Sequence, residues 1–141
     1  MDVTSFSPDS YYYFTIARNF VNGNGLTFDN YEITTGFHPL WFLIVSMIAK
    51  FTHSIETFLK VVYLTQNFLF IIAFYFLYHY CSKANYSIKM FFFISIPLFL
   101  VNINIFLSGV ENTLQFLLLC IFLWLFSQNN MNKVKNEILI S

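Results

Sequence analysis

Charged side chains are scarce in this chain of 141 residues, where they make up 10% of the sequence. A typical soluble domain carries about 25%. Seven basic and seven acidic residues give a net charge of zero, and only one of the basic residues is an arginine. Nucleic acids are recognised by clustered positive charge, so this composition argues against a nucleic-acid partner.

Cysteine and glycine are also sparse, and neither forms a known motif. The two cysteines, Cys81 and Cys120, show no Cys-x-x-Cys or Cys/His ligand spacing, which predicts two incidental thiols and no metal centre. None of the four glycines belongs to a phosphate-binding loop of the GxGxxG or GxxxxGK type. The sequence therefore indicates no certain cofactor, and whether a divalent metal takes part is left open.

Apolar residues dominate what is present, since 57% of the chain is hydrophobic and 20 residues are phenylalanine. Three apolar runs approach the roughly 20 residues that a membrane-spanning helix needs, which predicts transmembrane helices over about 55–80, 90–107 and 112–127. The apolar run after Pro39 is only about half that length, which is typical of an interfacial helix. We place this helix over about 39–52 and expect an all-α membrane protein.

The positions of the lysines predict how the spans are oriented. With three spans, residues 1–54 form an extracytoplasmic loop, and residues 55–141 hold the transmembrane helices and a cytoplasmic tail. The lysines that then lie on the cytoplasmic side are Lys83, Lys89, Lys133 and Lys135. The carboxylates that lie outside are Asp2, Asp9, Asp29, Glu32 and Glu111. Counting residues 40–51 as a span would separate Asp9 from Glu111, so we favour three spans in the cytoplasmic membrane.

Two stretches of the chain are polar. The first precedes the apolar runs and predicts an interfacial helix over about 9–22, because Ser7 can cap it and Pro8 suits its first turn. The sequence Asn-Gly-Asn-Gly then stops this helix. The second polar stretch follows Phe126 and is interpreted as a connector, with Ile138 to Ile140 at the start of a further helix.

Four residues are candidates for a functional site, and each has a structural alternative. Asp9 is either a general base or a helix cap. Arg18 either contacts a lipid phosphate or extends its charge from an apolar surface to water. His38 is more often a hydrogen-bonded structural group than a ligand. Glu111 lies between two apolar runs, where a carboxylate is costly unless it faces water, a partner or a cavity.

Two motifs carry a resemblance to a known family. Residues 8–41 read PDSYYYFTIARNFVNGNGLTFDNYEITTGFHPLW, and residues 108–115 read SGVENTLQ. The first resembles the pattern DDxYYYxxIARNxxxGxGxTFDGxxxTNGxHPLW, with Pro8 where relatives often have a second aspartate, and the other resembles SGxExxL. Both patterns are typical of polytopic GT-C glycosyltransferases of the protein O-mannosyltransferase and aminoarabinose transferase type. The resemblance covers residues 8 to about 126 and implies a partial GT-C fold.

The resemblance also implies roles for the four candidates. Members of the family transfer a sugar from a polyprenyl-phosphate carrier to an acceptor outside the cytosol, so the implied partners are this donor and the lipid bilayer. Asp9 falls at the acidic position of the first outer loop, which acts as the base, and Glu111 falls at a second acidic position in the next outer loop. Arg18 and His38 lie in the first motif and are expected to contact the donor phosphate.

Relatives carry a transmembrane helix before the first motif and several more helices after the second. The resemblance therefore implies a fragment or one part of a split transferase, with the remaining helices as a partner and without activity as an isolated chain. The alternative is a non-catalytic small membrane protein. It would be either an inactive remnant or a subunit that packs against a larger membrane complex.

Overall fold

A computed structural model describes residues 6–83, 86–106 and 108–140, so Asp2 lies outside the described residues. The helices of this part are α1 (Pro8–Val21), α2 (Pro39–Phe51), α3 (Ile55–Lys83), α4 (Ile88–Phe106) and α5 (Asn112–Ile140). Apart from one isolated antiparallel bridge between Thr27 and Ile33, the described residues contain no β-structure. The all-α prediction is confirmed.

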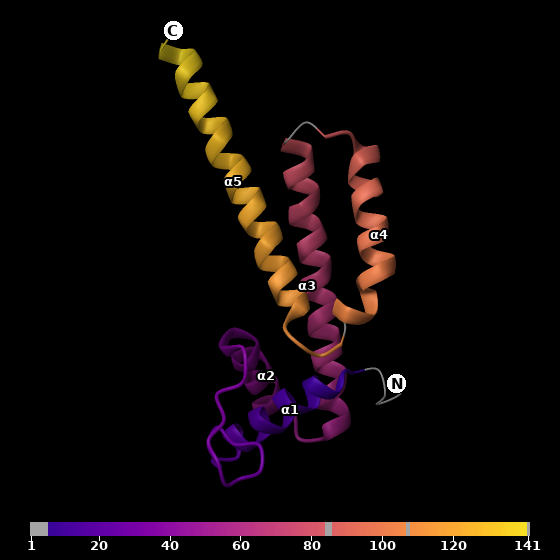
Figure 1. Ribbon diagram of the computed structural model, residues 1–141, viewed down its shortest axis with the longest axis vertical. Coiled ribbons are helices and arrows are strands. Elements are labelled where there is room, and N and C mark those ends of the chain that lie inside the picture. The colour runs from indigo at the N-terminus through magenta and orange to yellow at the C-terminus, as the bar shows by residue number, and fades with distance from the viewer. Residues whose placement is uncertain (1–5, 84–85, 107, 141) are drawn as a thin grey trace.

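The helices are arranged around α3, with α4 on one side and α5 on the other (Figure 1). The two short helices α1 and α2 pack against each other at the end of the molecule where α3 begins. α5 starts against α3 and leans away from it toward the C-terminus (Figure 1). The segment that joins α4 to α5 returns to the end where α1 lies, so two distant parts of the sequence meet there.

Local sequence sets both ends of α1. Pro8 lies in its first turn, where a backbone N–H would have no helical partner, and Gly23 follows its last residues with a left-handed φ of 86°. The capping prediction for Ser7 is wrong, because Ser7 occupies the N-cap position but its side chain makes no capping hydrogen bond. Its backbone N–H instead donates to the carbonyl oxygen of Ser108 at 2.8 Å, which ties the start of α1 to the segment before α5.

α2 begins where the sequence predicts, with Pro39 in its first turn, and ends at Phe51, one residue before the predicted end. Its 13 residues fall short of the roughly 20 that a membrane crossing needs. Trp41, Phe42 and Val45 are buried on one side of the helix, the side that packs into the core. How α2 lies relative to a membrane stays a prediction.

α3 is the one helix among the described residues that is long and apolar enough to cross a membrane. The predicted second and third spans correspond to α4 and α5. Within the described residues their apolar parts are shorter, at Ile88–Pro97 and Asn112–Gln128. Length and composition therefore support one membrane-crossing helix, and the three-span arrangement stays a prediction.

The polar stretch after Phe126 is helical, so the predicted connector there is wrong. α5 continues without interruption to Ile140. This stretch contains neither glycine nor proline, the residues that most strongly end a helix. Its polarity indicates that it does not pack in an apolar core, but polarity alone does not stop a helix.

Two apolar clusters hold the helices together. The larger joins α1, α2 and the start of α3, and its fully buried members include Ile16, Trp41 and Val62. The smaller lies between α3 and α5 and contains both thiols, Cys81 and Cys120, which are buried and unpaired. Full burial of one large apolar side chain is worth about 1.5–3 kcal/mol, so the larger cluster fixes where α1 and α2 sit on α3.

Candidate functional site

A cavity of about 510 Å³ lies between the start of α1 and the segment that joins α4 to α5. Both candidate carboxylates, Asp9 and Glu111, line this cavity. Its other lining residues are Pro8, Tyr12, Tyr13, Gly36, Val110 and Asn112. We call it the carboxylate pocket. Asp9, Tyr12 and Tyr13 are spaced by three and four positions, so they share one face of α1.

The segment that carries Glu111 is held by buried hydrogen bonds from two helices. In α3, Gln66 is fully buried and makes two bonds: its side-chain nitrogen donates to the Val110 carbonyl at 2.9 Å, and its side-chain oxygen accepts from the Gly109 N–H at 3.1 Å. In α2, the Trp41 indole N–H donates to the Gly109 carbonyl at 3.0 Å. The backbone on which Glu111 stands is therefore fixed from several sides.

Gly109 allows this segment to approach α1 closely. Its φ of 89° lies in the left-handed region, which side chains other than glycine rarely adopt. A Cβ atom at this position would lie 2.6 Å from Phe6 Cδ1 and 2.6 Å from Ser10 Cβ. Both the backbone conformation and the contact therefore require glycine here.

Glu111 pairs with His38 inside this arrangement. The His38 Nε2 atom lies 3.1 Å from Glu111 Oε1, and the Glu111 side chain is only 16% exposed. Its second oxygen, Oε2, is buried and accepts no hydrogen bond from the described residues. A buried carboxylate oxygen without a donor is costly, so this atom is suited to receive a donor from a bound molecule.

Tyr13 lies beside the same carboxylate. Its hydroxyl accepts a hydrogen bond from the His38 backbone N–H at 3.1 Å. Burial raises the pKa of Tyr13 above its ordinary value of 10.0; the bond from the His38 N–H opposes this, while a hydrogen bond to the Glu111 side chain and the charges of Glu111 and Asp9 raise the pKa further. The hydroxyl therefore keeps its proton at neutral pH and can donate it in a hydrogen bond.

The segment between α1 and α2 folds back over α1. Tyr12 stacks on Phe28 with ring centroids 5.2 Å apart, and its hydroxyl is hydrogen-bonded to Thr34. Further along, the backbone N–H groups of Tyr31 and Glu32 donate to Asp29 Oδ1, and these bonds lower the pKa of Asp29. These contacts hold the segment that brings Gly36 and His38 to the carboxylate pocket.

Arg18 does not join the other three candidates. It follows Asp9 by nine positions in α1, which places them roughly 13 Å apart along the helix axis. Its guanidinium carbon lies 5.9 Å from the centre of the Phe58 ring, and its side chain lines a different cavity at the far end of α1. That Arg18 and His38 contact the donor phosphate stays a prediction.

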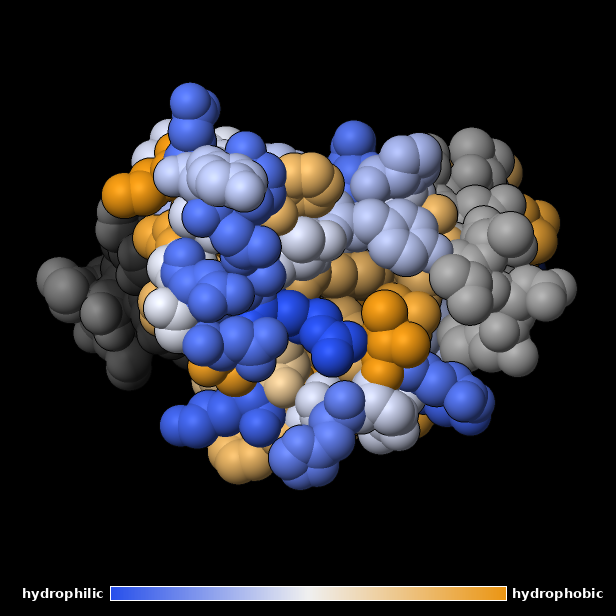
Figure 2. Space-filling model, turned by 90° about the horizontal axis from the view of Figure 1, so that it is seen from below, coloured by the Kyte–Doolittle hydropathy of each residue, from blue (hydrophilic) through white to orange (hydrophobic). Residues whose placement is uncertain are grey.

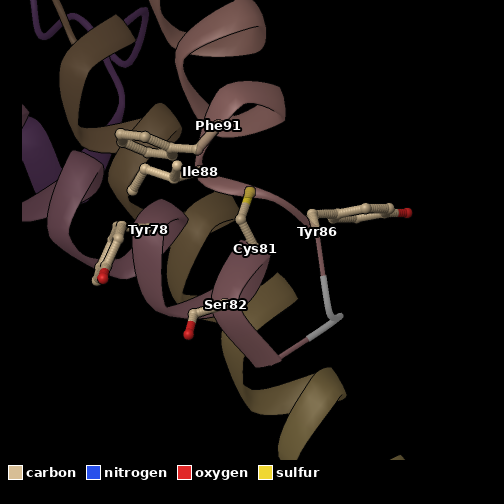
Figure 3. Close-up of a pocket in the computed structure, with 6 residues that line it drawn as sticks. All are labelled: Tyr78, Cys81, Ser82, Tyr86, Ile88 and Phe91. Carbon is tan, nitrogen blue, oxygen red and sulfur yellow. The ribbon is translucent and has the colours of Figure 1, made fainter.

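Another cavity lies at the opposite end of α3, where the chain enters α4 (Figure 3). Its lining residues are Tyr78, Cys81, Ser82, Tyr86, Ile88 and Phe91. The Cys81 sulfur points from α3 toward the start of α4 in Figure 3. No carboxylate or imidazole lines this cavity, so it lacks the groups that made the carboxylate pocket a candidate.

Several residues that line the pocket or support it are not among the four candidates from the sequence. Tyr12 and Tyr13 were visible as part of an aromatic run at helical spacing from Asp9, which is the signal that could have identified them. Gln66 was visible as a polar residue inside the longest apolar run, a pattern that indicates a buried polar contact. The partners of Gln66 carried no such signal, because they are backbone atoms of a distant segment.

Among the described residues, no three His, Cys, Asp or Glu side chains come together in a way that could hold a metal ion. Comparison with known proteins finds no family model, no curated protein and no solved structure that matches this chain. The expected resemblance to glycosyltransferases is therefore carried by the two sequence motifs alone.

Proposed function

We propose that this chain carries the donor- and acceptor-facing part of an integral membrane glycosyltransferase. It would take a sugar from a polyprenyl-phosphate carrier and transfer it to an acceptor on the extracytoplasmic side of the cytoplasmic membrane. The observation that supports this proposal is the carboxylate pocket, in which both motifs contribute an acidic residue, Asp9 and Glu111. Its volume of about 510 Å³ is within the range of about 300–1,000 Å³ that is usual for ligand pockets.

In the proposed reaction Asp9 is the general base. The acceptor hydroxyl gives its proton to the Asp9 carboxylate while its oxygen forms a bond to the anomeric carbon of the sugar. The bond from that carbon to the phosphate oxygen breaks, and the polyprenyl phosphate leaves with the electron pair. One displacement of this kind inverts the anomeric centre.

Glu111 has a different role in this proposal. Glu111 is paired with His38 and stands on a backbone segment that is held in place. Its carboxylate is therefore a rigid hydrogen-bond acceptor for hydroxyl groups of the sugar or of the acceptor molecule. Tyr13 supplies a neutral hydroxyl donor next to it. The differing surroundings of the two carboxylates suit different tasks, since Asp9 is exposed and Glu111 is mostly buried.

Donor binding tests this proposal without requiring turnover. The full chain in a nonionic detergent is titrated with undecaprenyl-phosphate mannose and with undecaprenyl-phosphate aminoarabinose. We expect one of them to bind, and Glu111→Gln to weaken its binding by about tenfold or more, because a charged hydrogen-bond partner is lost. Glu32→Gln is the matched control, since Glu32 is exposed outside the pocket. Equal binding by the wild type and Glu111→Gln would contradict the proposal, as would no binding of either donor.

A non-catalytic packing subunit remains the second candidate. The observation that favours it is the large apolar surface that α3, α4 and α5 leave exposed. This surface includes Leu64, Phe68, Ile71, Phe92, Phe93, Leu119 and Phe122. Exposed apolar surface of this extent fits either lipid or the helices of another chain. Cross-linking in membranes that captures a single polytopic partner, together with the absence of donor binding, would favour this candidate.

A further inference from the structure

A second polar cavity lies between the C-terminal ends of α1 and α2. It has a volume of about 280 Å³. Its lining residues are Arg18, Val21, Asn22, Ala49, Lys50, Thr52 and His53. Two of these residues carry a permanent positive charge, and none is acidic. We call it the cationic pocket. It shares no lining residue with the carboxylate pocket.

The positive charges of this pocket have no ion-pair partner among the described residues. The ion pairs of the described residues join His38 to Glu111 and Lys60 to Glu56. Neither Arg18 nor Lys50 therefore takes part in an ion pair. A helix C-terminus attracts cations with about half an elementary charge. The negative ends of α1 and α2 therefore only partly offset the charges of Arg18 and Lys50. The pocket keeps a net positive charge, which an anion from outside the described chain can pair with.

Arg18 is held in place for such a contact. It is half-buried, and its guanidinium lies over the face of Phe58, at 5.9 Å from the ring centre. This packing restricts the side chain, and Arg18 lines the cationic pocket, where its N–H groups can donate hydrogen bonds to a ligand. A planar guanidinium is well matched to two oxygens of a phosphate.

An exposed apolar stripe runs along α2, and its last residue, Phe51, follows the pocket-lining Lys50 in the chain. Leu40, Leu43, Met47 and Phe51 recur at spacings of three and four, so they lie on one face of the helix. They are 49%, 55%, 56% and 76% exposed, respectively, although the opposite face of α2 is buried in the core. The stripe ends next to Lys50 in the chain. Figure 2 shows this end of the molecule, where hydrophilic side chains gather with apolar ones between them.

From this combination we propose that α1 and α2 bind an anionic phospholipid. The headgroup phosphate would occupy the cationic pocket, between Arg18 and Lys50, and an acyl chain would lie along the apolar stripe. The charge balance favours a headgroup with a net negative charge over a zwitterionic one. The stripe favours a lipid over a soluble phosphate, since a soluble anion would leave it uncovered. The proposal does not depend on glycosyl transfer, because the two pockets are separate.

Calorimetric titration of the full chain in a nonionic detergent tests this site with three probes. These are short-chain phosphatidylglycerol, phosphatidylcholine with the same acyl chains, and inorganic phosphate. We expect phosphatidylglycerol to bind at least about tenfold more tightly than either other probe, because only it offers both a net negative charge and acyl chains. Equal binding of the two lipids would overturn the charge argument, and equally tight binding of inorganic phosphate would overturn the lipid assignment.

Matched variants test each half of the site. Lys50→Gln is expected to weaken phosphatidylglycerol binding by about tenfold, as loss of one charged contact does. Lys89→Gln, which removes an exposed lysine at the start of α4, should leave it unchanged. Met47→Gln should weaken lipid binding, whereas Leu64→Gln, an equivalent change at an exposed position of α3, should not. The proposal is wrong if Lys50→Gln and Lys89→Gln have the same effect, or if Met47→Gln and Leu64→Gln do.

Discussion

At the scale of single residues, one buried amide supports the candidate site. Gln66 has no exposed surface, and both ends of its side chain bind backbone groups of the segment that carries Glu111. A polar group in this position is tolerated because it is fully paired. Replacing Gln66 by an apolar residue would therefore leave the Gly109 N–H and the Val110 carbonyl without a hydrogen-bond partner.

Gln66→Met is expected to destabilise the protein while keeping the volume of the side chain. Each backbone group that is left buried and unpaired costs about 1–3 kcal/mol. Thermal unfolding in detergent should therefore give a clearly lower midpoint for this variant. Gln115→Met is the control, because Gln115 is exposed on α5. Similar midpoints for the two variants would show that the Gln66 bonds contribute little to stability.

Tyr13 gives the site a dependence on alkaline pH. Burial raises its pKa above 10.0, so the folded state favours the protonated phenol. This contribution to stability is present below about pH 10, the value for an unfolded chain, and is lost as pH rises through the folded pKa. The difference in absorbance at 295 nm between the wild type and Tyr13→Phe should therefore appear above pH 10. A difference that appears below that pH would contradict the proposed burial.

At the scale of secondary structure elements, the contact between α1 and the α4–α5 segment decides whether the pocket exists. Ser7 bonds to Ser108 at 2.8 Å, and Gly109 lies against Phe6 and Ser10. This contact brings Asp9 to Glu111. Any side chain larger than hydrogen at position 109 would push the two apart.

Gly109→Ala tests this contact, and Gly23→Ala is its matched control. Both glycines have a left-handed φ, 89° and 86°, so alanine should cost about 1–2 kcal/mol at either position. A Cβ at Gly23 meets nothing within 4 Å, whereas a Cβ at Gly109 lies 2.6 Å from Phe6 Cδ1 and 2.6 Å from Ser10 Cβ. The clash should add about 1–3 kcal/mol. Denaturant unfolding should therefore show a larger loss for Gly109→Ala, and equal losses would mean that the close approach does not form.

The sequence predicted those elements whose ends carry strong local signals. Both α1 and α2 begin at a proline, and α1 ends at an Asn-Gly-Asn-Gly run, so their bounds could be placed within about one residue. The extension of α5 to Ile140 could not be predicted from polarity, because a polar stretch without glycine or proline is compatible with both a connector and a helix.

The arrangement of the site was only partly predictable. The lysine pattern placed Asp9 and Glu111 on one side of a membrane, which is a coarse statement about proximity. The pairing of His38 with Glu111 and the bonds of Gln66 and Trp41 to the α4–α5 segment depend on tertiary packing. No local pattern encodes such contacts. Arg18 shares a motif with Asp9, but nine positions of α1 lie between them, and Arg18 lines a different cavity.

At the scale of the whole molecule, the account predicts an orientation in the membrane. The end of the molecule that holds α1, α2 and the carboxylate pocket should be extracytoplasmic, and the connection between α3 and α4 should be cytoplasmic. A single cysteine at Ser54 or Ser82 tests this, with Cys81 and Cys120 replaced by alanine. Both serines are exposed. A membrane-impermeant maleimide added from outside should label position 54 only, and labelling of position 82 would contradict the orientation.

The central claim is that Asp9 removes a proton from the acceptor in the carboxylate pocket. The most direct measurement is the rate of sugar transfer from the undecaprenyl-phosphate-linked donor in membranes that contain a complete transferase, in which this chain is joined to the remaining helices. Asp9→Asn should lower this rate by about 10²–10⁴-fold, because it removes the base and keeps the size of the side chain. Glu32→Gln, the corresponding change at an exposed carboxylate outside the pocket, should leave the rate nearly unchanged. An Asp9→Asn variant that transfers sugar as fast as Glu32→Gln would show that Asp9 is not the base.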